Sequence, residues 1–203
     1  MAERRPRRHF SMIRDFHLAD FFTIANGFCG ILAVFEAMKF LATGDRRHLW
    51  MAALLIPLAL LFDVLDGRLA RWRHKSSPMG RELDSLADVI SFNVAPAGIA
   101  FAAGLDTVLD QVILMYFVGC GVSRLARYNI TAESLAADAG KVTYFEGTPV
   151  PTSLIPLALL MLAFHQDALF PVRWLGVSFH LVALLFALSG SLMISKTLRI
   201  PKP

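Results

Sequence analysis

The chain has 203 residues, of which 56% are hydrophobic and 18% charged, and its mean hydropathy is +0.55. This composition is more apolar than that of a soluble domain, and it excludes a soluble enzyme and a disordered polypeptide. The net charge of +4 does not call for a nucleic-acid partner, because basic loops that face anionic lipid headgroups are expected of a membrane protein.

Six apolar stretches approach the roughly 20 residues that a helix needs to cross a hydrocarbon core about 30 Å thick. Because lipid offers the backbone no hydrogen-bond partner, and because the stretches do not alternate apolar with polar residues, we expect helices and not strands. The predicted fold class is all-α, a polytopic bundle of six transmembrane helices. In chain order, the predicted spans are Leu18–Leu41, His48–Ala70, Leu83–Leu105, Thr107–Ile130, Thr152–Phe170 and Val172–Ile194.

The spans also predict the domain organisation and the orientation. Residues 1–17 form a basic N-terminal segment with an expected interfacial helix, residues 18–195 form the transmembrane domain, and residues 196–203 form a C-terminal tail. Six spans put both termini on one side of the membrane, together with sixteen of the 20 Lys and Arg residues. The other four are Lys39, Arg46, Arg47 and Arg173. The positive-inside rule therefore predicts cytoplasmic termini in the cell (inner) membrane.

Four aspartates lie where the second and third spans meet across a short polar turn. Helical periodicity puts Asp63 and Asp66 on one face of the second span, and a short connection makes the third span its antiparallel neighbour. We therefore expect all four carboxylates to converge. The full pattern is Asp63-x-x-Asp66-Gly67-x-x-Ala70-Arg71, then eight residues, then Gly80-x-x-x-Asp84-x-x-x-Asp88.

Four carboxylates gathered at a membrane boundary repel one another and are costly to bury unless cations lie among them. A set of oxygen ligands without Cys or His favours a hard divalent ion, so the predicted cofactor is Mg²⁺ or Mn²⁺, as two ions. The alternative is that neighbouring arginines neutralise the acids. The small residues Gly67, Ala70 and Gly80 leave room for a nucleotide, and Arg71 is placed to pair with its phosphates.

The complete pattern resembles the signature of the CDP-alcohol phosphotransferases and matches it at every position. The resemblance implies a six-helix membrane enzyme, commonly a homodimer, that takes a CDP-linked lipid and an alcohol and releases CMP. It implies that Asp88 is both a metal ligand and the catalytic general base for the incoming hydroxyl. The remaining implied roles are metal ligands at Asp63, Asp66 and Asp84, a nucleotide pocket at Gly67, Ala70 and Gly80, and a diphosphate contact at Arg71.

Further segments resemble the branch of this family whose donor is CDP-diacylglycerol and whose acceptor is L-serine. The chain departs from that branch at Asn93, where Gly is expected, and at Thr148, where Leu is common. The segments are Thr23–Gly30, Asp84–Ala97, Arg124–Asn129 and Phe145–Pro151.

A serine acceptor requires a cation for its carboxylate and polar atoms for its ammonium group. Arg124 and Arg127 supply candidate cations near one end of the fourth span, and Asn93 and Asn129 are the polar candidates. Both arginines would alternatively extend to lipid headgroups. Asn26 is either a nucleotide ligand or an interhelical hydrogen-bond donor, and we predict the nucleotide.

Other readings remain open at this point. The long polar connection Thr131–Pro151 is either a mobile lid or an ordinary loop. The acceptor is alternatively glycerol 3-phosphate, inositol phosphate or choline. A cation transporter is disfavoured, because the acids cluster at one membrane face and the chain has no two matching halves. The predicted partners are CDP-diacylglycerol, L-serine, membrane lipids and a second copy of the chain, with no nucleic acid.

Overall fold

The computed structural model describes residues 18–73, 78–137, 144–174, 176–195, 197 and 199–201. Within these ranges, only the backbone is described at 18–19, 70–73, 78, 131–137, 144–146, 174 and 199–201. The basic segment of residues 1–17, with its predicted interfacial helix, lies outside the described residues. The helices are α2 (Leu18–Thr43), α3 (Arg46–Arg73), α4 (Pro78–Val89), the π-helix η1 (Ile90–Val94), α5 (Ala95–Ala103), α6 (Val108–Ala137), the 3₁₀-helix η2 (Val150–Ser153), α7 (Leu154–His165) and α8 (Ala183–Ile194).

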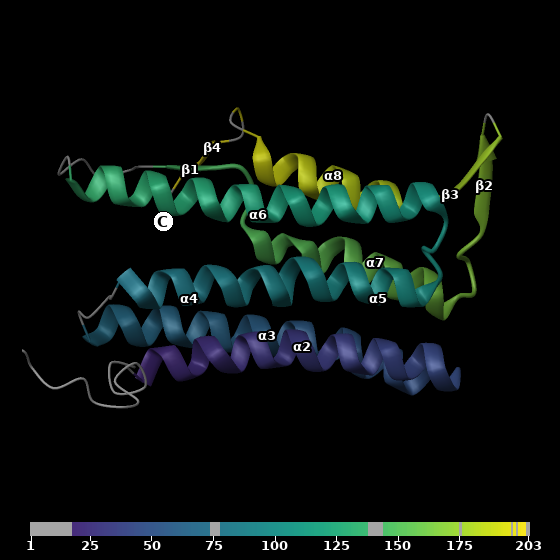
Figure 1. Cartoon of the computed structure of the whole chain (residues 1–203), viewed down its shortest axis with the longest axis horizontal. Helices are drawn as coiled ribbons and strands as arrows, with labels where there is room; N and C mark the ends of the chain where they lie inside the picture. Colours follow the sequence, from purple (N-terminus) through teal and green to yellow (C-terminus); the bar gives the residue numbers. More distant parts are fainter. Residues whose placement is uncertain are drawn as a thin grey trace, which may run out of the picture.

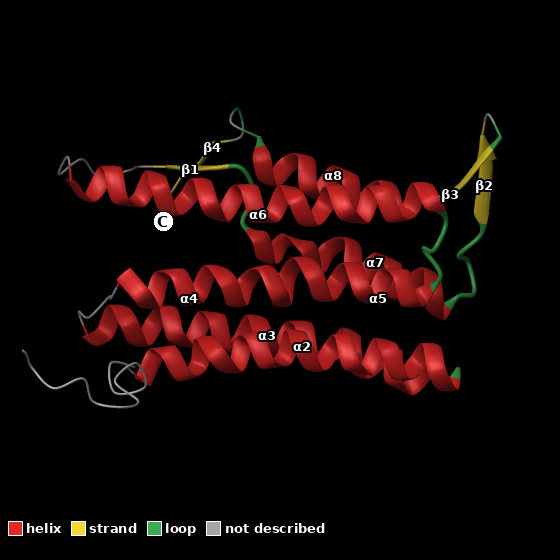
Figure 2. Ribbon diagram, viewed as in Figure 1, coloured by secondary structure: helices red, strands yellow, loops and turns green. Residues whose placement is uncertain are grey.

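The helices run roughly along the long axis of the molecule (Figures 1 and 2), with α2 and α3 on one side and α6 and α8 on the other. The α4–α5 segment and α7 lie between these two layers. Four stretches are long and apolar enough to cross a membrane: Asp20–Thr43, Arg46–Leu69, Met79–Ala103 and Val108–Ile130. The shorter apolar stretches Val150–His165 and Ala183–Ile194 complete six. The prediction of an all-α, six-helix polytopic bundle is confirmed.

The predicted sixth span is wrong in its first part. Instead of a helix from Val172, the chain forms an antiparallel hairpin of β2 (Pro171–Trp174) and β3 (Val177–His180), and α8 begins only at Ala183. Gly176 has φ 84°, the left-handed conformation that lets the hairpin turn. An apolar run has no periodicity that separates a helix from a strand, so the sequence pattern missed this break.

A tight turn folds α3 back along α2, so that the two helices are antiparallel. Gly44 has φ 71° and its amide donates to Phe40 O at 2.8 Å, which ends α2 with a left-handed residue. The Asp45 carboxylate then accepts a hydrogen bond from Arg47 N at 2.9 Å and caps the first turn of α3. The start of α2 therefore lies beside the end of α3, where the acidic motif begins.

Small residues bring α2 against the third spanning segment. A Cβ at Gly27 would lie 3.6 Å from Ala87 Cβ, and one at Gly30 would lie 2.7 Å from Ser91 Oγ. Such close backbone approach is typical of helix pairs in membranes. The Ser91 hydroxyl uses this proximity to donate to Asn26 O at 2.8 Å.

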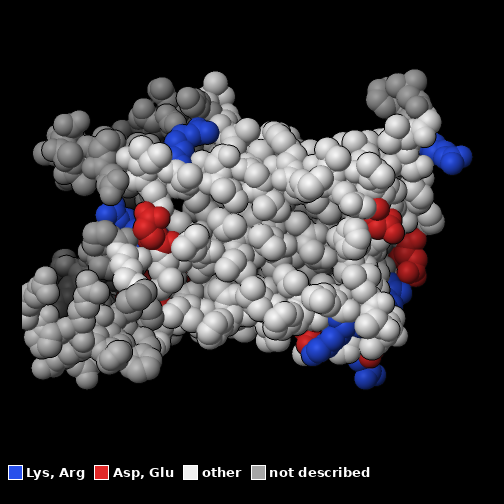
Figure 3. Space-filling model, in the orientation of Figure 1, with Lys and Arg blue, Asp and Glu red and all other residues white. Residues whose placement is uncertain are grey.

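The acidic and basic side chains gather at the two ends of the molecule, with an uncharged band between them on the face shown in Figure 3. At the end away from the acidic motif, buried Glu36 of α2 accepts hydrogen bonds from His48 Nδ1 at 2.6 Å and Lys39 Nζ at 2.7 Å. At the same end, buried Asp110 of α6 accepts from His180 N at 2.9 Å and His180 Nδ1 at 2.7 Å, so it ties the hairpin to α6.

The later part of the Thr131–Pro151 connection is docked on the bundle. Strand β1 (Tyr144–Glu146) pairs antiparallel with β4 (Arg199–Pro201) of the C-terminal tail. Thr148 N donates to Leu192 O at 3.2 Å, and Gly147 lies against the backbone of Met193. Residues 138–143 of the connection, the centre of the predicted lid, lie outside the described part of the chain.

Candidate active site

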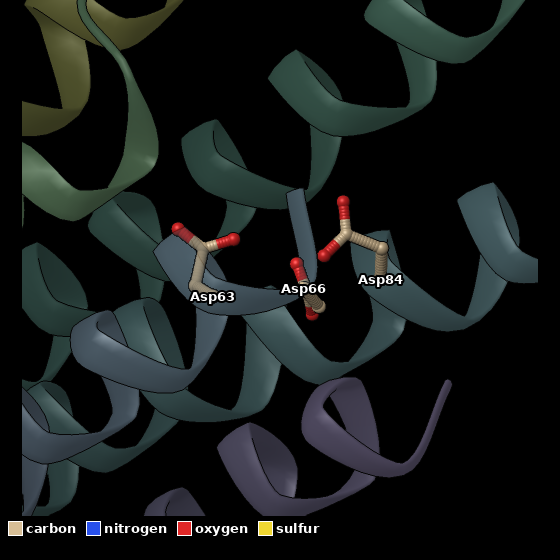
Figure 4. A group of neighbouring side chains, drawn as sticks. All are labelled: Asp63, Asp66 and Asp84. Carbon is tan, nitrogen blue, oxygen red and sulfur yellow. The ribbon is translucent and has the colours of Figure 1, made fainter. Parts of the chain in front are cut away.

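Three of the four motif aspartates form one cluster at the end of α3 and the start of α4. Asp63, Asp66 and Asp84 each present a carboxylate oxygen, and these oxygens all lie within 4.8 Å of one another. Figure 4 shows the carboxylates of Asp63 and Asp84 on either side of Asp66. In Figure 3, acidic side chains at this end of the molecule lie beside a hollow in the surface, with basic side chains near them.

The cluster fits the divalent metal that the sequence predicts. Asp84 Oδ1 is buried and has no hydrogen-bond partner among the described residues, although buried carboxylate oxygens are normally satisfied. All the convergent donor atoms are carboxylate oxygens, which Mg²⁺ and Mn²⁺ prefer. The charges of Asp63 and Asp84 act on one another at short range, and a divalent cation would neutralise them.

The fourth aspartate has a different environment. Asp88 is buried one helical turn beyond Asp84, and its Oδ1 accepts a hydrogen bond from Asn26 Nδ2 at 3.0 Å. It is not among the three residues whose oxygens converge, but it interacts electrostatically with Asp63, Asp84 and Arg124. Asp88 therefore interacts electrostatically both with the other acids and with the basic residue of α6.

The predicted nucleotide ligands are only partly described. A Cβ built at Gly67 would meet no atom of the described residues within 4 Å, so open space lies above this residue, beside Asp66. Gly80 lies in the first turn of α4. Ala70 and Arg71 belong to α3, but their side chains lie outside the described part of the structure.

The Asn26 amide is turned to Asp88, and its Oδ1 is buried without a partner among the described residues. Its amide donates to Asp88, as given above, and one turn earlier on α2 the hydroxyl of Thr23 donates to Asp66 Oδ2 at 2.8 Å. Sequence reasoning missed the contact of Thr23. The available signal was the placement of two polar residues, i and i+3, on the face of an otherwise apolar span that meets the motif.

The two arginines of the predicted serine pocket differ in their contacts. Arg124 Nε is buried without a hydrogen-bond partner in the described structure, and the guanidinium interacts electrostatically with Asp88. Arg127 Nη1 donates to Ile194 O at 3.5 Å, at the C-terminal end of α8. A cation at this position is favourable to the helix dipole, so Arg127 has a structural contact, whereas no hydrogen bond of Arg124 is seen among the described residues.

The two asparagines of the predicted serine pocket also differ. Asn93 is fully buried in η1, its Oδ1 has no partner among the described residues, and its Nδ2 lies 4.0 Å from Met193 Sδ. Its amide lies directly against Gly121, where a Cβ would fall 2.1 Å from Nδ2. Asn129 instead bridges two helices, because Oδ1 accepts from Ser85 Oγ at 3.1 Å and Nδ2 donates to Glu82 Oε2 at 3.2 Å.

The described residues form a helical bundle with a cluster of three carboxylates, and a fourth, buried aspartate lies one turn from it. The chain belongs to the CDP-alcohol phosphatidyltransferase family, whose model matches residues 16–189, and the family prediction is confirmed.

Three relatives carry the name CDP-diacylglycerol–serine O-phosphatidyltransferase. The protein from Saccharomyces cerevisiae is 45% identical over 96% of this chain and 74% of its own length. The protein from Methanocaldococcus jannaschii is 33% identical over 92% of this chain and 75% of its own length. The protein from Bacillus subtilis is 30% identical over 79% of this chain and 84% of its own length.

Proposed function

We propose that this protein transfers the phosphatidyl group of CDP-diacylglycerol to L-serine, giving phosphatidylserine and CMP. The convergence of Asp63, Asp66 and Asp84, with Asp88 one turn away, carries the proposal. The names of the three relatives support this donor and this acceptor.

The residues of the site fit each part of this reaction. Asp63, Asp66 and Asp84 are the residues that would hold Mg²⁺ or Mn²⁺, with Asp88 as a further ligand. When bound, such ions neutralise charge on the diphosphate and favour the departure of CMP. Gly67 leaves space for the nucleotide beside the aspartates, and Gly80, Ala70 and Arg71 complete the proposed nucleotide and diphosphate pocket.

Asp88 is the proposed general base. An aliphatic hydroxyl is a weak nucleophile at neutral pH, so a base within hydrogen-bond reach must remove its proton. The serine oxygen forms a bond to the phosphorus that carries the diacylglycerol, the bond from that phosphorus to the bridging oxygen breaks, and CMP leaves with the bridging oxygen. The hydroxyl proton passes to Asp88.

Arg124 is the proposed ligand of the serine carboxylate. Its buried Nε lacks a partner in the described structure, and its charge acts on that of Asp88, which supports a role near the base. Asn93 lies one turn deeper than Asp88, and its unpartnered Oδ1 is a suitable acceptor for the serine ammonium group. Arg127 and Asn129 would act indirectly, since their described contacts hold α8 and α4 against α6.

The charge distribution supports one orientation in the membrane. The site lies at the end of the molecule that the positive-inside rule assigns to the cytoplasm, so both termini and the site are proposed to be cytoplasmic in a cell (inner) membrane. We further propose that residues 18–195 act as one catalytic domain and that the protein functions as a homodimer.

The activity is tested with purified protein in vesicles that contain CDP-diacylglycerol. We expect CMP release to require both L-serine and Mg²⁺ or Mn²⁺, to stop with a chelator, and to accompany formation of phosphatidylserine. Release that responds to glycerol 3-phosphate, inositol phosphate or choline instead of serine would assign another acceptor. If no alcohol gave metal-dependent release of CMP, the proposed transferase activity would be refuted.

The serine pocket is tested by Arg124→Ala. The variant should raise the serine KM at least about tenfold, as expected when a charge-assisted contact worth roughly 1.5–3 kcal/mol is lost, with the CDP-diacylglycerol KM little changed. Arg127→Ala serves as the matched variant, and it should lower thermal stability more than it changes the serine KM. Equal effects of Arg124→Ala on both substrates would contradict the assignment.

A further inference from the structure

We propose that α2 is a positioning element of the site, in which Asn26 orients the general base Asp88 and Thr23 orients the metal ligand Asp66. The roles of both residues depend on the proposed function, since the functions of Asp88 and Asp66 come from it. Asn26 thereby acts on the base and not as the nucleotide ligand that the sequence predicts.

The hydrogen bonds of the two side chains carry this assignment. Asn26 and Thr23 are both buried, and each donates to one aspartate from the same face of α2, at 3.0 Å and 2.8 Å. Each bond engages one oxygen of the carboxylate. Rotation of the carboxylate is then restricted, and its second oxygen keeps a fixed direction for a substrate proton or a metal ion.

The backbone of α2 at Asn26 is itself held in place. The hydroxyl of Ser91, on η1, donates to Asn26 O at 2.8 Å, and Gly30 allows the two segments to touch. Asn26 is therefore joined to the third spanning segment by its side chain and by its main chain. Turning the amide toward a nucleotide would break the bond to Asp88 while the backbone stayed fixed.

The chemistry of the two donors suits this role. A neutral amide or hydroxyl stabilises a carboxylate without forming an ion pair, so Asp88 keeps its capacity to accept a proton and Asp66 its capacity to bind a cation. A Lys or Arg at either position would neutralise the acid instead. The choice of Asn26 and Thr23 is thus consistent with one base and one metal ligand that both remain functional.

The experiment compares Asn26→Leu and Thr23→Val in vesicles, with serine-dependent CMP release and with direct Mn²⁺ binding followed by electron paramagnetic resonance. Loss of a residue that orients a metal ligand or a base typically lowers metal affinity or activity by about 10–100-fold. Asn26→Leu should lower kcat by about this factor, with the CDP-diacylglycerol KM and the Mn²⁺ affinity within twofold of wild type. Thr23→Val should instead weaken Mn²⁺ binding by about tenfold, and Thr23→Ser should restore it.

Two further variants make the outcome decisive. Phe28→Leu changes an exposed residue of α2 and should match wild type in every measurement. Asn26→Ala removes the amide donor without adding bulk or charge, so it decides the question if Asn26→Leu does not fold. An unchanged kcat in folded Asn26→Ala, or a raised CDP-diacylglycerol KM with normal kcat in Asn26→Leu, would overturn the assignment.

A failure of the proposed function gives a different result. In that case wild-type protein releases no CMP when serine is added, whereas Mn²⁺ binding still separates Thr23→Val from wild type. If Mn²⁺ binds equally to wild type, Thr23→Val and Thr23→Ser, the positioning role of α2 toward Asp66 is wrong, whatever the reaction.

Discussion

Asp84 and Asp88 are one helical turn apart on α4, and their surroundings differ. Asp84 belongs to the converging group and has a buried oxygen without a partner in the described structure, which suits a metal ligand. Asp88 accepts a hydrogen bond from a neutral amide and lies near the charge of Arg124, which suits a base next to a substrate carboxylate. These different surroundings support the proposal that the two aspartates have different chemical roles.

This difference predicts the effect of Asp88→Asn. The new amide oxygen can still accept from Asn26, so the side chain should keep its orientation while losing its capacity to take a proton. We expect kcat to fall at least about a hundredfold, within the range for loss of a general base. The rate of CMP release measures this fall in kcat. Binding of Mn²⁺ and of CDP-diacylglycerol should stay largely intact. The control is Asp106→Asn, which lies on the exposed loop at the opposite end of the molecule. Near-normal turnover of Asp88→Asn would exclude Asp88 as the general base.

Gly67→Ala tests the nucleotide pocket. The added methyl group meets no described atom within 4 Å, so the variant should fold as wild type does. The methyl group would occupy the open space where the nucleotide is proposed to lie, and the CDP-diacylglycerol KM should rise about tenfold or more, in line with overpacking costs of roughly 1–3 kcal/mol. A thermal melt verifies folding, and a KM equal to that of wild type would place the nucleotide elsewhere.

At the level of the elements, the sequence predicts the first four spans well and the last two less well. The predicted fifth span, Thr152–Phe170, is too long, because α7 ends at His165. The structure places helices at α2, α3, α4–α5 and α6 close to the predicted bounds, because each span is long and is closed by a clear turn such as Gly44-Asp45. The predicted sixth span, Val172–Ile194, is also apolar, but a hairpin occupies its first part. Length and hydropathy alone do not distinguish an apolar hairpin from the start of a helix.

The sequence likewise predicts one part of the site and misses another. Spacing within one helix predicts which residues share a face, and Asp63, Asp66 and Asp84 do converge. Contacts between helices depend on their relative rotation and depth, which spacing does not define. The bond from Asn26 to Asp88 and the bridge of Asn129 to α4 could therefore not be derived from the sequence.

The contact between α2 and η1 predicts the behaviour of Gly30→Ala. A Cβ there would lie 2.8 Å from Ser91 Cα, so the two segments must separate, and Asn26 would move away from Asp88. We expect a loss of stability of about 1–3 kcal/mol together with lower kcat. Gly119→Ala on α6, where a Cβ meets open space, is the matched control and should leave both unchanged. Thermal melts and CMP release are the measurements, and a stable, fully active Gly30→Ala would show that this contact does not matter.

In the whole molecule, the acidic site and the pair of Asp110 and His180 lie at opposite ends of the bundle. His180→Ala removes the imidazole bond to a fully buried carboxylate, so we expect a loss of roughly 1.5–3 kcal/mol, seen as a lower melting temperature. The folded fraction should keep the metal requirement of wild type, because no described residue of the site contacts this end. His165→Ala, which removes an exposed ring, is the comparison. An altered metal requirement in His180→Ala would mean that the Asp110–His180 pair is coupled to the acidic site.

The turn of α3 that carries Asp63 and Asp66 also carries Val64 and Leu65, whose side chains are exposed on the apolar exterior. A diacyl substrate can therefore bring its phosphate to the acids while both fatty tails stay among neighbouring lipids. Drawing those tails into water would cost about 0.8 kcal/mol for each methylene. A lipid that enters the site sideways from the bilayer avoids that cost. The two proposed substrates, a water-soluble amino acid and an insoluble lipid, can therefore meet where α3 passes from the hydrocarbon core into the aqueous phase.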